Sequence, residues 1–217
     1  MMHDRSSPRP FATLRQFVPK RRQVERCELC GAALAPEHQH LIEPAARRLA
    51  CCCDACAILF DNEQSVRFRR VPRDITPLSD FQMSDAQWED LRIPINLAFF
   101  YHSTPAGRVI ATYPSPAGAT ESLLPLEAWR ELQDQNPILR ELRPDVEALL
   151  VNRVGQEPLY YRVPIDECFK LVGLIRTHWR GLSGGTEVWR EINAFYGSLA
   201  ARSPAQAWSV ERKPCPT

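Results

Sequence analysis

The sequence lacks a long apolar run. Its longest apolar and aromatic stretch near the middle, Leu97–Tyr101, is far shorter than the ~20 residues that a helix needs to cross a bilayer. The segment Met1–Arg22 has no apolar region of the kind that secretory signals carry, and Arg21-Arg22 is followed by polar and charged residues, unlike a twin-arginine export signal. We therefore expect a cytoplasmic protein without a membrane span.

Sequence motifs of the common enzyme classes are missing as well. No P-loop, GxGxxG or HExxH occurs. Cys168 and His178 could suggest a nucleophile and its base, but they are ten residues apart on one expected helix, which separates them by about 15 Å along the axis. The sequence therefore offers no positive argument for an enzyme and identifies no small-molecule substrate.

Charge of one sign is not in excess over the whole chain, which has 27 Lys and Arg against 26 Asp and Glu. The balance is uneven, because the first 26 residues carry +5 and residues 27–217 carry −4. We expect a basic, flexible leader over residues 1–25. Because the remainder is not basic, no extended nucleic-acid surface is expected.

Cysteine, by contrast, is abundant and unevenly placed. Six of the eight cysteines fall between Cys27 and Cys56, and Cys168 and Cys215 lie outside that segment. Stable disulfides are rare in the cytoplasm, where clustered cysteines more often bind metal. The clustering predicts a metal-binding module over residues 26–62.

Two CxxC pairs lie in this module, Cys27-Glu-Leu-Cys30 and Cys53-Asp-Ala-Cys56. One CxxC places two sulfurs on a tight turn, where both can reach an ion at about 2.3 Å. Two such pairs separated by roughly 20 residues are typical of a tetrahedral four-cysteine site. We therefore predict that Cys27, Cys30, Cys53 and Cys56 bind one metal ion.

The ligand set and the metal both have alternatives. Cys51 adjoins the second pair and could replace Cys53, while His38 and His40 form an HxH that could coordinate instead. Four cysteines without an open position favour structural Zn²⁺, which adds folding free energy to a small module. The same four ligands could hold iron or an iron–sulfur cluster.

The residues between the pairs predict a treble-clef or zinc-ribbon arrangement. His40-Leu-Ile and Arg48-Leu-Ala are expected to form a hairpin around Glu43-Pro-Ala-Ala, and Asp54–Phe60 is expected to begin a helix after Cys53. The helix N-terminus would favour the anionic thiolates. Five arginines are placed to offset the negative charge of a loaded site: Arg21, Arg22, Arg26, Arg47 and Arg48.

Residues 81–202 predict an α+β domain with a largely antiparallel sheet, because two hairpins alternate with helices. The hairpins are Ile95–Ser103 with Arg108–Ser115 and Val146–Val154 with Pro158–Ile165. Pro114–Ser122, rich in Pro, Ser, Gly and Thr, is expected to be a loop. Residues 63–80 are expected to be a linker with one short strand over residues 66–71, and residues 203–217 a flexible tail.

The helices of this domain have local start signals. Ser84-x-x-Gln87 is a capping box, Pro125 can occupy the first turn of a helix, and Asp166 is expected to be an N-cap. A final helix is expected from apolar side chains at helical spacing: Val188, Ile192, Phe195, Tyr196 and Leu199.

Several stretches resemble a family of bacterial proteins of unknown function that are often encoded beside actinobacterial-type, high-affinity [NiFe] uptake hydrogenases. They are CELCG, HxHL, the CxxC-AxLFD helix, LRIPINLAFF, YPSPAGATESLLPL, PDVEALLVNR, VPIDECFKLVGLIR and WRGLSGGTEVW. The resemblance covers about residues 24–200. It implies an accessory protein in assembly, maturation or electron handling, with hydrogenase subunits or maturation factors as partners, and it carries over no catalytic residue.

Three functions follow as hypotheses. The first is a zinc-stabilised accessory protein that docks on a hydrogenase or its maturation factors. The second is a redox protein that holds iron, in a rubredoxin-like or iron–sulfur site, at the same cysteines. The third is a regulator that binds nucleic acid through its zinc ribbon and its basic leader.

Overall fold

Two antiparallel sheets organise the chain in a computed structural model that describes residues 24–61, 67–181 and 184–204. The predicted α+β class is confirmed: antiparallel hairpins alternate with helices, and the cysteine cluster lies near the N-terminus. Most of the predicted leader and tail lies outside the described residues, as do Arg21, Arg22, Val66 and Cys215.

The larger sheet has six strands in the order β4–β9–β8–β5–β6–β7. Their bounds are β4 Thr76–Pro77, β5 Leu97–Ser103, β6 Arg108–Ser115, β7 Gly118–Ser122, β8 Glu147–Asn152 and β9 Leu159–Pro164. Both predicted hairpins are confirmed, with Tyr101 opposite Ile110 in one and Leu150 opposite Tyr161 in the other.

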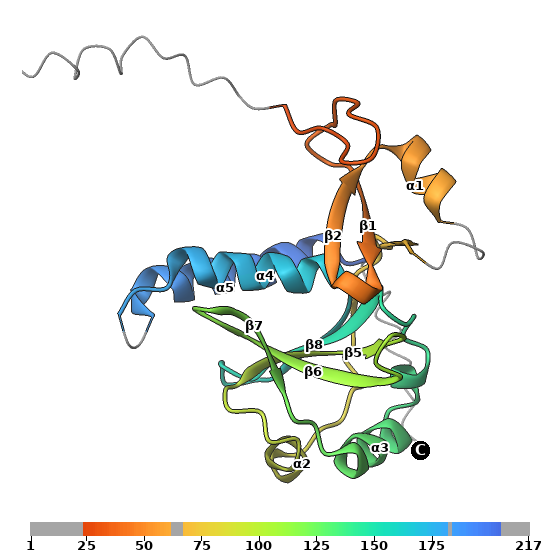
Figure 1. Cartoon of the computed structure of the whole chain (residues 1–217). Helices are drawn as coiled ribbons and strands as arrows, with labels where there is room; N and C mark the ends of the chain where they lie inside the picture. The colour runs from red at the N-terminus through yellow and green to blue at the C-terminus, as the bar shows by residue number, and fades with distance from the viewer. Residues whose placement is uncertain (1–23, 62–66, 182–183, 205–217) are drawn as a thin grey trace, which may run out of the picture.

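Helices cover both faces of this sheet, so the body has three layers (Figure 1). Side chains of a strand alternate between faces. Phe99 and Leu150 therefore pack against α4 (Ile165–His178) and α5 (Gly185–Arg202), while Phe100 packs against α2 (Asp85–Asp90) and α3 (Leu126–Gln135). Burial on both faces explains the continuous apolar sequence of β5 and β8.

The helix starts follow their local signals in part. Ser84 and Gln87 form the predicted capping box of α2, whereas Pro125 is the N-cap of α3 and so precedes the first turn in which it was expected. The prediction of Asp166 as an N-cap is wrong, because α4 begins at Ile165 with Pro164 as its cap. Strand β9 runs directly into α4 and leaves Asp166 inside the first turn, where its carboxylate bonds to His40.

The expectation of a loop over Pro114–Ser122 is also wrong. The chain turns between Ser115 and Gly118 and returns as the edge strand β7, with Thr120 opposite Tyr113. Gly118 has a φ of 124°, and the Ser115 hydroxyl donates a hydrogen bond to its carbonyl. The strand was missed because it has no fully buried side chain and so no alternating apolar signal.

The cysteine module stands beside the body on a three-stranded sheet of order β2–β1–β3 (Figure 1). Its elements are β1 Gln39–Glu43, the 3₁₀ turn η2 Pro44–Ala46, β2 Arg48–Cys52, α1 Asp54–Phe60 and β3 Arg69–Arg70. The predicted hairpin and the helix after Cys53 are confirmed. Ile42 and Leu49 contact the core of the body, so the hairpin joins it near η2 and presents the cysteines at its other end.

A second 3₁₀ turn, η3 (Pro137–Arg140), follows α3. Among the described residues, none of the helices has the length and apolar character to span a membrane.

Candidate metal centre

The first CxxC forms a knuckle closed by backbone hydrogen bonds. The Cys27 N–H donates to the Ala32 carbonyl at 2.8 Å, and the Gly31 N–H donates to the Cys27 carbonyl at 2.8 Å. Gly31 has a φ of 78°, which a residue with a side chain rarely adopts. The glycine therefore lets the chain turn so that Cys27 and Cys30 lie on the same side of the knuckle.

The second CxxC lies at the start of α1. Strand β2 ends at Cys52, Cys53 is the N-cap of α1, and Cys56 lies in its first turn. The Ala57 N–H donates to the Cys53 carbonyl at 2.9 Å and closes this turn. The chain changes direction where β2 ends and α1 begins. This change brings the thiols of Cys53 and Cys56 close to the knuckle.

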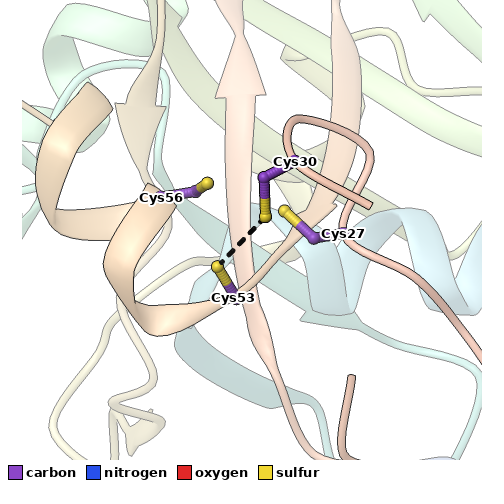
Figure 2. Close-up of side chains that lie close together, drawn as sticks. All are labelled: Cys27, Cys30, Cys53 and Cys56. Atoms are coloured by element: carbon purple, nitrogen blue, oxygen red, sulfur yellow. Dashed lines mark hydrogen bonds between the residues drawn. The ribbon is translucent and has the colours of Figure 1, made fainter. Parts of the chain in front are cut away.

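The four predicted ligands converge. Their sulfur atoms lie within 4.8 Å of one another, and the side chains point to a common centre (Figure 2). The Sγ atoms of Cys30 and Cys53 are 3.7 Å apart. A tetrahedral ion with Zn–S bonds of ~2.3 Å requires an S–S separation of ~3.8 Å, so the donor set and its spacing fit such an ion.

Cys27 is the thiol best prepared to ionise. Burial raises its pKa, but backbone N–H groups of Cys53, Leu29 and Cys30 bond to its sulfur and outweigh the burial, so that its pKa is lowered to about 6. A thiolate is the form that binds metal. The knuckle therefore favours the anionic form of Cys27, which a metal ion at this position would require.

The other end of the cluster resists ionisation. Burial and hydrogen bonds with the neighbouring thiols raise the pKa of Cys56 far above its usual range. Cys27 and Cys56 are buried, while Cys30 is exposed. A divalent cation would offset the mutual repulsion of the thiolates, and its binding would release protons.

Cys51, His38 and His40 lie close together as a separate group, and are not among the four converging cysteines. Cys52 belongs to neither group, since it faces the opposite side of β2 and its thiol donates to the Gln39 carbonyl at 3.4 Å. Burial raises the pKa of Cys52 to about 11, as suits a packed apolar residue. Successive side chains of a strand point to opposite faces, so the sequence itself indicates that Cys51 and Cys52 lie on different faces of β2.

Three of the five arginines expected to offset the charge of the site, Arg26, Arg47 and Arg48, lie among the described residues, and each bonds to an oxygen of the protein. Arg47 donates to Glu121 of β7 at 2.9 Å, and Arg48 donates to Glu28 of the knuckle at 2.9 Å. Arg26 donates to the Gly31 carbonyl at 3.0 Å and so lies against the knuckle. Two of the three described arginines therefore tie elements together through carboxylates.

The catalytic pair considered for the body is not formed. Cys168 lies on α4 and is fully buried in the core of the body. This burial raises the pKa of its thiol well above the usual range. His178 instead lies 3.2 Å from a Glu187 carboxylate oxygen on α5.

A family model described as "Family of unknown function (DUF5947)" matches residues 26–203. No curated protein and no solved structure matches the chain. The matched region contains all four converging cysteines and the whole body, up to the end of α5.

Proposed function

The chain belongs to a family of unknown function, DUF5947, and from that premise we propose that it is a cytoplasmic accessory protein held together by one structural Zn²⁺. The observation that carries the proposal is the convergence of Cys27, Cys30, Cys53 and Cys56 within 4.8 Å. Four thiolates complete a tetrahedral shell and leave no position for a substrate. The ion therefore stabilises the module and does not perform chemistry.

The proposed partner is a subunit or maturation factor of an actinobacterial-type [NiFe] hydrogenase. The support for it is the resemblance of stretches such as LRIPINLAFF and VPIDECFKLVGLIR to proteins often encoded beside such enzymes. The cysteine module projects from the body. The end of the module that carries the exposed Cys30 is therefore accessible to a second protein.

Metal analysis of the full chain tests the first part of the proposal. Purified under air and without air, the protein should be colourless and contain zinc, and Cys27→Ser or Cys56→Ser should remove one equivalent. The matched control is Cys168→Ser, which changes a buried cysteine outside the module and should leave the metal content unchanged. An iron-loaded, coloured protein would support the redox hypothesis and overturn the zinc assignment.

Co-purification tests the second part. The full chain should retain hydrogenase subunits or maturation factors, and Cys27→Ser should weaken that retention while Cys168→Ser does not. If none of these proteins is retained by the zinc-loaded chain, the accessory role is wrong while the metal site still stands.

A further inference from the structure

A second group of metal-binding side chains lies on one face of the β1–β2 hairpin. His38 precedes β1 and is two residues from His40, and Cys51 of β2 is the direct cross-strand partner of His40. One ring nitrogen of each histidine and the Cys51 Sγ lie within 4.8 Å of one another. We propose that His38, His40 and Cys51 bind a divalent transition-metal ion at a site separate from the four-cysteine centre.

Both imidazole rings are oriented by an oxygen acceptor. The Nδ1 atom of His38 lies 3.0 Å from the Ala35 carbonyl, and the Nδ1 atom of His40 lies 2.8 Å from a carboxylate oxygen of Asp166. A carbonyl and a carboxylate accept hydrogen bonds, so they keep the proton on Nδ1 and leave the lone pair on Nε2. Histidines that bind metals are usually oriented in this way by a carbonyl or carboxylate.

The Nε2 atom of His38 is an independent sign of a missing ligand. It is buried and has no hydrogen-bond partner among the described residues, and the His38 side chain is only 8% exposed. A buried polar atom without a partner costs about 1–3 kcal/mol. A metal ion between His38, His40 and Cys51 would satisfy this lone pair.

The donor set indicates the class of ion. Two imidazoles and one thiolate suit Zn²⁺, Co²⁺ or Ni²⁺, whereas Ca²⁺ and Mg²⁺ prefer oxygen ligands. Three protein ligands leave one position of a tetrahedron for water or another small ligand, in contrast to the closed four-cysteine centre. His38 and His40 also line a cavity of about 450 Å³, which provides a route for the ion.

Asp166 links this site to the body, because it lies on α4 while His40 lies on β1. Its role is that of a positioning residue, since it contacts the His40 Nδ1 atom and is not one of the three grouped donors. Removing an outer-shell carboxylate of this kind lowers metal affinity by about 10- to 100-fold. Asp166→Asn should therefore weaken binding without removing the site.

Titration of the untagged, reduced and metal-stripped full chain with Zn²⁺ or Co²⁺ tests the proposal. The wild-type chain should bind two equivalents. Cys51→Ser and His40→Gln should each lose one equivalent of metal. With Co²⁺, each should also lose the thiolate charge-transfer absorption of the proposed site, which is weaker than that of the four-cysteine centre because the site has a single thiolate. Cys27→Ser should lose the other equivalent, which tests the four-cysteine centre separately.

Two controls separate binding from misfolding. Cys52→Ala changes the adjacent cysteine on the opposite face of β2, and His178→Gln changes a histidine of the body; both should retain two equivalents. Asp166→Asn should bind two equivalents at saturation with one affinity lowered about 10-fold or more. A wild-type chain that binds one equivalent, lost in Cys27→Ser and kept in Cys51→Ser, would overturn the second site.

Discussion

At the scale of single residues, Glu147 is a buried carboxylate of the body whose charge needs partners. Its side chain is buried at the start of β8, and its carboxylate accepts hydrogen bonds from the Arg143 guanidinium at 2.9 Å and from Arg162 at 2.7 Å. Burial raises the pKa of Glu147, but the bonds from the two arginines and from the Arg143 N–H outweigh it, so the pKa lies below its usual value. The carboxylate is therefore stabilised in the folded state in its charged form.

Glu147→Gln should lower the free energy of unfolding by about 1–3 kcal/mol, because it replaces the charge-assisted hydrogen bonds from two guanidinium groups by weaker neutral ones. Since the folded-state pKa is depressed, the stabilisation is complete above the ordinary carboxyl pKa of about 4.5 and is lost as pH falls through the lower, folded-state value. Urea denaturation at several pH values measures this, and the difference between wild type and variant should shrink below pH 4.5. Exposed Glu157→Gln is the control, and an equal effect there would contradict the assignment.

At the scale of elements, α2 shows how local side chains can determine a short helix. The Gln87 N–H donates to the Ser84 hydroxyl at 3.2 Å, and the Ser84 N–H donates to the Gln87 side chain at 2.9 Å. The Gln87 amide also donates to Gln135 of α3 at 2.8 Å, which joins two helices on the same face of the sheet. A helix of six residues needs such contacts, because isolated short helices are marginal in water.

Ser84→Ala should lower the free energy of unfolding by about 1 kcal/mol, because it removes the cap while leaving the helix sequence unchanged. Ser84→Thr keeps a capping hydroxyl and should retain most of the stability. Chemical denaturation of the three proteins measures the difference. If Ala and Thr destabilise equally, the hydroxyl does not contribute as a cap.

At the scale of the whole molecule, the module has a small core of its own. It joins the body through Ile42 and Leu49, which pack on the core of the body, and through polar contacts. The core of the module has few members: Cys27, Leu34, Leu41, Cys52, Cys56, Ala57 and Phe68. The polar side-chain contacts that cross to the body include Arg47 with Glu121, His40 with Asp166, and Arg69 with Asp145 at 3.3 Å. The partly exposed charge pairs among these contribute little, so a metal ion bound by the four cysteines would add to the stability of the module.

Chelation should therefore act on the module and not on the body. Removing metal from the full chain should raise amide hydrogen exchange in β1, β2 and α1, while β5 and β8 stay protected by their own two cores. Exchange measured by mass spectrometry before and after chelation checks this. A uniform rise over all strands would show that the two parts unfold together, and the prediction of a distinct module over residues 26–62 would then be wrong.

Much of the fold could be predicted where the signal is local. Ser84 begins α2 through its own capping box, and the turn between β5 and β6 separates two apolar strands. The edge strand β7 and the start of α4 could not be predicted in this way. Thr120 gains its partner only from β6, and Asp166 is placed by the chain direction of β9 and by His40, which is 126 residues away in sequence.

The metal centre divides in the same way. The spacing of Cys27, Cys30, Cys53 and Cys56 was sufficient to select the four cysteines that converge, because each CxxC is a local unit that needs only a tight turn. The tertiary structure decided which neighbouring residues do not join these four cysteines. Strand pairing places Cys51 opposite His40 and turns it away from Cys52, and a contact across the molecule orients His40. Sequence alone thus determined the presence of a cysteine cluster, and only packing separated its four converging members from the group formed by His38, His40 and Cys51.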